Sequence, residues 1–265
     1  GSLYVCPFFF QVSEMLLYTR KAQYKYRDVT LLQQDSNGPC PLIAVTNALI
    51  LKGHVRLPSQ PHSSCIPIAT VEDVVKTFLN TSQRSLFPEN EHFQFSIDCA
   101  IRLLPKLRNG LDVNPKFDNI DAFEATDETS LFDACRLRLV HGLMMDEAGD
   151  AALKLEVGKA SYNTMICKMT ELEAAGDAAS PTQHFFSDWI RAFPTQLTYR
   201  GLIDLTDGIA ESEIAVLFRN NHFSVLTKEG GVLYTLVTDI GMSTARPDAV
   251  WESLVDVTGE ASVFR

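Results

Sequence analysis

The 265-residue chain lacks the sequence features of secreted, zinc-binding and membrane-spanning proteins. It has no C-x-x-C pair and no signal-peptide pattern, and its six cysteines lie at wide, irregular spacings. The apolar stretch Leu3–Phe10 is too short to span a bilayer, contains Pro7 and follows no basic region. We therefore expect free thiols in a reducing compartment, the cytoplasm or also the nucleus, with no metal, no other cofactor and no membrane partner.

No Pro-, Gly- or Ser-rich linker and no internal repeat divides the chain, and 46% of its residues are hydrophobic. This composition can form a substantial core, so we expect one domain over residues 1–265. Within it, residues 1–23 would form an N-terminal extension that begins with a cloning scar, Gly1-Ser2.

Positive charge is also scarce, because 23 Lys and Arg residues stand against 33 Asp and Glu residues and give a net charge of −10. A nucleic-acid partner would need a basic face to bind its phosphates, so this partner class is disfavoured. An acidic chain is instead compatible with a protein partner that carries basic residues around an apolar patch.

The feature around which the chain is organised is a turn followed by a strongly apolar helix. Asn37-Gly38-Pro39 is a turn signal, and the run from Cys40 to Gly53 is long enough for about three helical turns. Cys40 would therefore begin a helix that is apolar on nearly every face and buried centrally. The helix N-terminus favours the thiolate, and Pro41 suits a first-turn position, so Cys40 is the candidate nucleophile.

Six residues upstream, Gln34 can turn its amide back toward the space in front of Cys40. This amide and the backbone N–H of Cys40 would supply two hydrogen-bond donors to an oxyanion, which acyl transfer requires. A Gln six positions before a Cys at a helix start is the arrangement of papain-like thiol proteases. It predicts a general base elsewhere in the chain.

The candidate base is His222, near the C-terminal end. Residues 215–218 and 222–227 read as two strands joined by an Asn-rich bend, and His222 begins the second. Residues 232–239 read as the next strand, which ends with Asp239. An antiparallel neighbour could bring this carboxylate to the imidazole, so Asp239 is a candidate for orienting His222. Three polar neighbours of the histidine are open alternatives for that role: Asn220, Asn221 and Ser224.

Other reactive side chains have simpler interpretations. Cys99 and Cys135 lie in apolar sequences with helical spacing, which is typical of small buried hydrophobic residues. His141 is a second candidate base, but a histidine among aliphatic residues is more often a core residue with satisfied hydrogen bonds.

The middle of the chain is mainly helical. Helices are predicted over residues 94–107, 126–146, 162–175, 183–191 and 196–205, with a small polar loop at 174–181. Together with the C-terminal strands, this pattern predicts an α+β, papain-like fold. In it, a helical half that carries Cys40 would pack on an antiparallel sheet that carries His222, with the cleft between them.

Seven short segments occur in a recognisable order along the chain. They are Asn37–Leu42 with Gln34 before it, Leu111–Asn114, His141-Gly142, Val157–Lys159, Ser161–Asn163, Gln196–Tyr199 and Phe218–Ser224. Through these segments the chain resembles the catalytic domain of the MINDY deubiquitinases, from about Tyr24 to Val263. The resemblance covers nearly the whole sequence.

The resemblance implies a papain-like thiol peptidase that hydrolyses the isopeptide bond at the C-terminus of ubiquitin, with a family preference for lysine-48-linked chains. It assigns the nucleophile to Cys40, the general base and later acid to His222, and the oxyanion donor to Gln34. Ubiquitin and polyubiquitin chains would be the partners of a monomeric enzyme.

Candidate ubiquitin contacts follow from the same segments. Val113 and Phe218 could form apolar lining of a ubiquitin groove, and Asp112 and Tyr162 could make polar contacts; each could equally be a core or loop residue. The sequence departs from relatives of the family at Leu143, where they have Trp, so a ubiquitin contact there would be altered.

Two alternatives remain open at this point. The first is a catalytically silent polyubiquitin-binding module of the same fold, against which the intact Gln34, Cys40 and His222 argue. The second is a thiol peptidase or acyltransferase that acts on another substrate.

Overall fold

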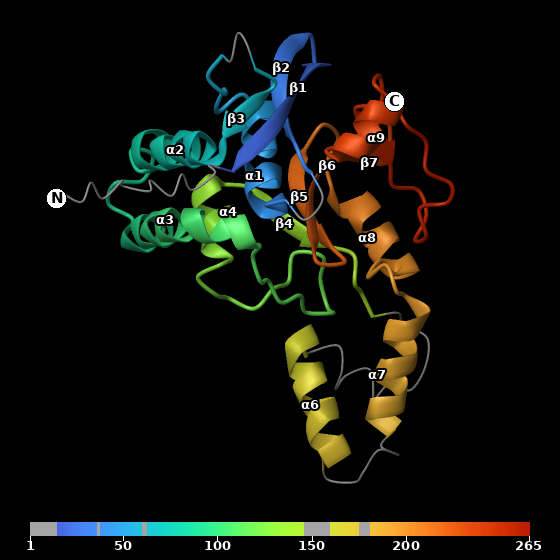
Figure 1. Cartoon of the computed structure of the whole chain (residues 1–265). Helices are drawn as coiled ribbons and strands as arrows, with labels where there is room; N and C mark the ends of the chain where they lie inside the picture. The colour runs from blue at the N-terminus through green and yellow to red at the C-terminus, as the bar shows by residue number, and fades with distance from the viewer. Residues whose placement is uncertain (1–14, 36–37, 60–62, 146–159, 175–180) are drawn as a thin grey trace, which may run out of the picture.

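Two β-sheets enclose one buried helix in the computed structural model, which describes residues 15–35, 38–59, 63–145, 160–174 and 181–265 (Figure 1). The helix is α1 (Cys40–Leu51), and every residue from Pro41 to Leu51 is buried. It packs against strand β2 of one sheet and against strands β5 and β6 of the other. The prediction of a central helix that begins at Cys40 is confirmed.

The first sheet has three antiparallel strands in the order β2-β1-β3. These strands are β1 (Leu16–Tyr24), β2 (Arg27–Gln33) and β3 (Cys65–Pro67). Residues 16–23, which the sequence assigned to an extension, therefore form most of the central strand of this sheet. The apolar stretch Leu3–Phe10 lies outside the described residues.

The second sheet has five strands in the order β4-β5-β6-β7-β8. They are β4 (Arg138–His141), β5 (Ile214–Arg219), β6 (His222–Glu229), β7 (Val232–Leu236) and β8 (Trp251–Ser253). All neighbouring pairs are antiparallel except β4 and β5, which are parallel. The expected purely antiparallel sheet is therefore a mixed sheet, and the fold is α+β.

Strand β4 replaces part of a predicted helix. The helix expected over 126–146 is short, α4 (Ser130–Cys135), and it ends because Arg136 adopts a left-handed backbone conformation with φ of 51°. The chain then enters β4, whose Leu139 and Val140 are buried. Pairing with β5 satisfies the backbone of this segment, so tertiary contacts override the local helical pattern.

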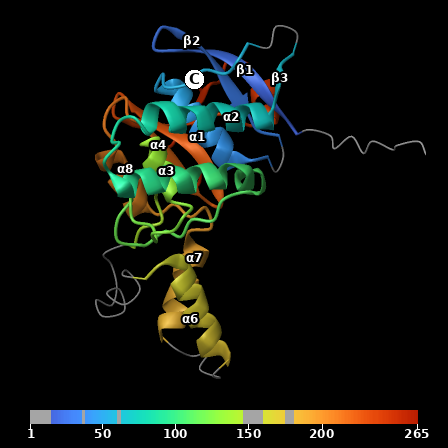
Figure 2. The same cartoon turned by 90° about the vertical axis from the view of Figure 1, so that its left-hand side faces the viewer.

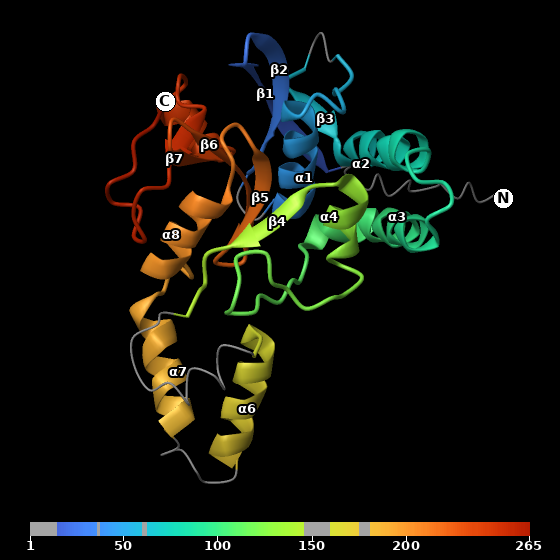
Figure 3. The same ribbon diagram turned by 180° about the vertical axis from the view of Figure 1, so that it is seen from behind.

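Both faces of the five-stranded sheet are covered. On β5, Val216 and Phe218 face the core that contains α1, whereas Ala215 and Leu217 belong to a second core beneath α8 (Tyr199–Gly208). A strand buried on both faces reads as a continuous apolar run, as β5 does. Figure 3 shows α8 along the opposite side of this sheet from α1.

Further helices flank the first core (Figure 2). They are α2 (Ile68–Phe78), the π-turn η1 (Leu79–Gln83), α3 (Glu91–Leu103) and the 3₁₀ turn η2 (Leu104–Asn109). The helix predicted over 94–107 thus corresponds to α3 and η2 together. The short helix α9 (Ile240–Ala245) has no buried residue and lies near β7 (Figure 1).

Helices α6 (Tyr162–Ala174) and α7 (Pro181–Ala192) project from the body as a pair (Figures 1 and 2). They carry a small core of their own, in which Phe117 and Leu143 of the body meet Met165, Phe186 and Trp189. Leu143 is therefore a buried packing residue. Most of the predicted loop at 174–181 lies outside the described residues, and no helix within the described ranges is long and apolar enough to cross a membrane.

Candidate active site

Cys40 begins α1 between two prolines. Pro39 adopts φ −75° and ψ 68°, the geometry of an inverse γ-turn, and this turn directs the backbone N–H of Cys40 onto the carbonyl of Gly38 at 2.8 Å. The side chain is half-buried, and its sulfur lies within hydrogen-bonding range of the backbone N–H of Phe223 in β6. The thiol therefore faces the start of β6.

His222 is the first residue of β6 and the neighbour of Phe223. It pairs with Arg219 across a two-residue turn, in which Asn220 and Asn221 have φ of 51° and 57°. These are the left-handed conformations that a type I′ hairpin turn requires and that Asn tolerates. The predicted Asn-rich bend is confirmed, and it fixes His222 one residue from the backbone partner of the thiol.

Burial sets the protonation of both groups. It raises the pKa of the Cys40 thiol, although the backbone N–H groups of Phe223 and Cys40 act in the opposite direction. Burial also lowers the pKa of His222. At neutral pH the resting thiol and the resting imidazole are therefore both uncharged. The sequence predicted a lowered thiol pKa from the helix N-terminus, but loss of solvent outweighs that effect here.

Gln34 lies just beyond the end of β2, with its side chain folded toward Cys40. Its Nε2 donates to the carbonyl of Gly38 at 3.3 Å, the same carbonyl that accepts from the Cys40 N–H. The two donors predicted for the oxyanion thus converge on one acceptor position. In this structure the Gly38 oxygen fills that position.

Asp239 lies elsewhere than the sequence predicted. Strand β7 ends at Leu236, and Asp239 is the exposed N-cap residue of α9, where its Oδ1 accepts from the N–H of Met242 at 2.7 Å. Within the described parts of the chain, no hydrogen bond or ion pair joins this carboxylate to His222.

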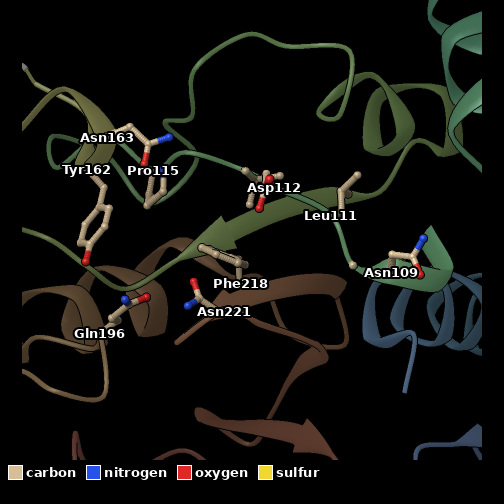
Figure 4. Close-up of a pocket in the computed structure, with 11 residues that line it drawn as sticks. Asn109, Leu111, Asp112, Pro115, Tyr162, Asn163, Gln196, Phe218 and Asn221 are labelled. Atoms are coloured by element: carbon tan, nitrogen blue, oxygen red, sulfur yellow. The ribbon is translucent and has the colours of Figure 1, made fainter. Parts of the chain in front are cut away.

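A cavity of about 610 Å³ opens beside the Asn220-Asn221 turn (Figure 4). All four candidate ubiquitin contacts line it: Asp112, Val113, Tyr162 and Phe218. Figure 4 shows Phe218 and Asn221 opposite the segment that carries Asp112, with Tyr162 and Gln196 to one side. The structure therefore brings together residues that lie more than 100 positions apart in the sequence.

Sequence reasoning missed the residues that hold the walls of this cavity together. Asn114 is buried and donates from Nδ2 to Ser161 Oγ at 2.9 Å, while its Oδ1 accepts from the N–H of Asn163 at 3.0 Å. Ser161 in turn donates to Glu124 at 2.5 Å, and these bonds lower the pKa of the Glu124 carboxyl. Asn114 therefore fastens the Asp112 segment to the start of α6. The only sequence signal for this structural role was that Asn114 and Ser161 are polar residues of the matching segments.

His141 is a core residue. Its ring is 1% exposed and stands edge-on to Phe123. The backbone N–H of Leu143 donates to Nδ1 at 3.2 Å, so Nε2 carries the proton and donates to the carbonyl of Ala122 at 3.1 Å. Burial lowers the pKa of His141 to about 4, and the ring stays neutral at physiological pH. The interpretation as a second base is not supported, and the core interpretation is confirmed.

Two cysteines predicted as small buried residues are indeed buried. Cys99 is 1% exposed and Cys135 is fully covered, and burial raises the pKa of Cys135 to about 12. Cys65 and Cys167 are free thiols nearer the surface, so Cys167, on an exposed position of α6, offers a matched comparison with Cys40.

Comparison with known proteins places this geometry in context. The family model described as MINDY deubiquitinase matches residues 16–265. The chain is similar to ubiquitin carboxyl-terminal hydrolase MINDY-1 of Bos taurus, with 37% identity over 245 residues that cover 90% of this chain and 50% of that protein. Human MINDY-1 is 36% identical with the same coverage, and MINDY-2 of Bos taurus is 36% identical over 91% of this chain and 38% of its own length. The chain thus spans about half the length, or less, of these relatives.

Proposed function

Because the chain belongs to the MINDY deubiquitinase family, we propose that it is a thiol-dependent deubiquitinase with a papain-like site. Its substrates are polyubiquitin chains joined by isopeptide bonds, with lysine-48 linkage preferred. Cys40 is the nucleophile, His222 the general base and then acid, and Gln34 an oxyanion donor.

The observation that carries the proposal is the convergence of two donors on one acceptor. The Gln34 amide and the Cys40 N–H both donate to the Gly38 oxygen, at 3.3 and 2.8 Å, and an oxyanion likewise requires two donors that meet at one position. Their present acceptor is a backbone carbonyl of the chain itself. A substrate carbonyl must displace the Gly38 oxygen from that position before the two donors can stabilise an oxyanion.

The reaction proceeds in two stages. His222 takes the proton of the Cys40 thiol, and the sulfur attacks the carbonyl carbon of the terminal glycine of ubiquitin. The intermediate collapses to a thioester as His222 protonates the departing lysine amine. Water, deprotonated by His222, then attacks the thioester and releases the ubiquitin carboxylate and the free thiol. The neutral resting imidazole is ready to accept the first proton without a prior proton loss.

The cavity beside the turn supports the substrate assignment. Val113 and Phe218 line it with the small part of their apolar side chains that is not buried in the core, and the carboxylate of Asp112 is exposed there. Ubiquitin presents basic residues around an apolar recognition patch, so both features have a counterpart on that partner.

Cleavage of a panel of diubiquitin linkages and of longer lysine-48 chains tests the proposal. We expect product from lysine-48-linked chains and none with Cys40→Ala, whereas Cys167→Ala retains wild-type turnover. Gln34→Ala should lose on the order of 10²-fold in rate, as single oxyanion donors do. Cleavage that survives Cys40→Ala would contradict the assignment, and cleavage spread evenly over all linkages would contradict the preference.

The alternative is a silent polyubiquitin-binding module of the same fold. The occupied acceptor position at Gly38 and the neutral thiol favour it as a description of the resting chain. A ubiquitin with a C-terminal electrophile separates the two functions, because it labels Cys40 only if the site can assemble around the ubiquitin tail. Binding of polyubiquitin without any labelling would favour the module.

A further inference from the structure

The backbone of Gln34 is held by a segment distant in the sequence. The ladder between β1 and β2 ends at Gln33, which pairs with Tyr18, so Gln34 lies beyond the support of its own sheet. Its N–H instead donates to the carbonyl of Thr238 at 2.7 Å, and its carbonyl accepts from the N–H of Ile240 at 3.1 Å. These two bonds form a parallel bridge in which Gln34 faces Asp239.

The same segment is fixed by the first turn of α9. The Asp239 side chain accepts from the N–H of Met242, and its backbone carbonyl accepts from the N–H of Ser243 at 3.0 Å. The Ser243 hydroxyl also binds the side-chain amide of Gln33. Three hydrogen bonds therefore join the end of β2 to the segment that begins α9, and two of them form the Gln34 bridge.

We propose that Asp239 is a positioning residue for the Gln34 side-chain amide, acting through the capped turn of α9 and the backbone bridge. This inference rests on the proposed role of Gln34 as an oxyanion donor. The Asp239 carboxylate accepts from the N–H of Met242 and, within the described residues, makes no hydrogen bond with the imidazole of His222. It would therefore affect the position of the Gln34 amide and not the basicity of His222.

The kinetic test compares three variants in ubiquitin cleavage. Asp239→Ala removes the cap of α9. Loss of a cap lowers the equilibrium constant for forming the helical turn by roughly a factor of three to ten. We therefore expect kcat to fall by about that factor, with KM unchanged. Asp239→Asn should restore most of the lost turnover, since Asn caps a helix about as well as Asp. Asn90→Ala removes the matching cap of α3, where Asn90 accepts from Phe93 at 3.0 Å, and should leave turnover at the wild-type level.

A double-mutant cycle with Gln34→Ala decides the route of action. If Asp239 acts through Gln34, Asp239→Ala adds no further loss once the Gln34 amide is gone. If Asp239→Ala instead lowers kcat by the same factor in the Gln34→Ala background as in the wild type, the proposal is overturned. It is also overturned by an Asp239→Asn variant that is as slow as Asp239→Ala and has a shifted acid limb in its pH profile, because that result identifies a carboxylate acting on His222.

The side-chain amide NMR signal of Gln34 gives a readout that needs no turnover. Gln34→Ala identifies this signal by its disappearance, and we expect it to shift or broaden in Asp239→Ala but not in Asp239→Asn or Asn90→Ala. An unchanged Gln34 signal in Asp239→Ala would overturn the positioning role even if the chain cleaves ubiquitin. A wild-type chain without Cys40-dependent cleavage would refute the proposed function and leave this structural test intact.

Discussion

The side chain of Asn47 in α1 makes both backbone hydrogen bonds of Leu32 in β2. Its Oδ1 accepts from the Leu32 N–H at 2.8 Å, and its Nδ2 donates to the Leu32 carbonyl at 2.9 Å. Both residues are fully buried. The amide thus imitates a neighbouring strand, and it fixes the strand that leads to Gln34 against the helix that begins at Cys40.

Replacement of Asn47 tests this link. Asn47→Leu keeps a similar volume but leaves the N–H and carbonyl of Leu32 buried without partners, which should lower the free energy of unfolding by roughly 2–5 kcal/mol. The neighbouring Thr46 is the control, because its buried hydroxyl has no hydrogen-bond partner within the described residues. Thr46→Val should therefore be neutral or stabilising in denaturant titrations. Equal losses for the two variants would contradict the role of Asn47.

The raised pKa of Cys40 predicts slow alkylation of the free protein at neutral pH. Because burial stabilises the neutral thiol, the rate of Cys40 labelling by iodoacetamide should keep rising above the ordinary thiol range. Peptide mass spectrometry over a pH series gives this rate, with Cys167 as an internal comparison in the same digest. An inflection below pH 7 would instead reveal a thiolate paired with an imidazolium in the resting protein.

His141 predicts a pH dependence of stability. Folding lowers the pKa of His141 from 6.5 to about 4. As the pH falls, the imidazole is therefore protonated in the unfolded chain before it is protonated in the folded one. Its full contribution to the free energy of unfolding is present only above pH 6.5. As the pH falls from 6.5 to 4, this group should withdraw about 3 kcal/mol of stability.

The comparison that isolates this effect is His141→Gln, which cannot titrate. Denaturant unfolding at pH 7 and pH 4 should show wild type well above the variant at pH 7, with the gap narrowing toward pH 4. A gap that is constant with pH would mean that His141 titrates alike in the folded and unfolded states.

Asp112 predicts an electrostatic contribution to ubiquitin binding. It is exposed at the cavity wall, so Asp112→Asn should raise KM for a ubiquitin substrate by about two- to fivefold at low salt without changing the melting temperature. Asp118→Asn, an exposed change away from the cavity, is the control. The difference between the two variants should vanish at high salt, and its persistence there would point to a direct hydrogen bond.

Much of the site was readable from the sequence because its parts are local. The apolar run after Cys40 and the Asn-Asn bend before His222 each specify their own backbone, and the structure has both elements. Asn37 of the predicted turn lies outside the described residues. Gln34 could be paired with Cys40 because the two lie only six positions apart in the sequence.

What the sequence did not predict depends on contacts between distant segments. Leu139–His141 has a pattern that suits a helix end, and only the parallel partner β5 makes it a strand. Asp239 was predicted to end a strand, yet β7 ends at Leu236 and Asp239 instead caps the start of α9. Three-dimensional packing also sets the hydrogen bond from Asn114 to Ser161. It likewise decides that burial raises the pKa of the Cys40 thiol more than the helix N-terminus lowers it.

The most direct test of the account is the site of attachment of a ubiquitin that carries a C-terminal electrophile. After reaction and digestion, peptide mass spectrometry should find one adduct, on Cys40, and His222→Ala should slow its formation while Cys167→Ala leaves it unchanged. An adduct on another cysteine, or a wild-type chain that binds polyubiquitin and forms no adduct, would contradict the assignment of Cys40 and His222 as the reacting pair.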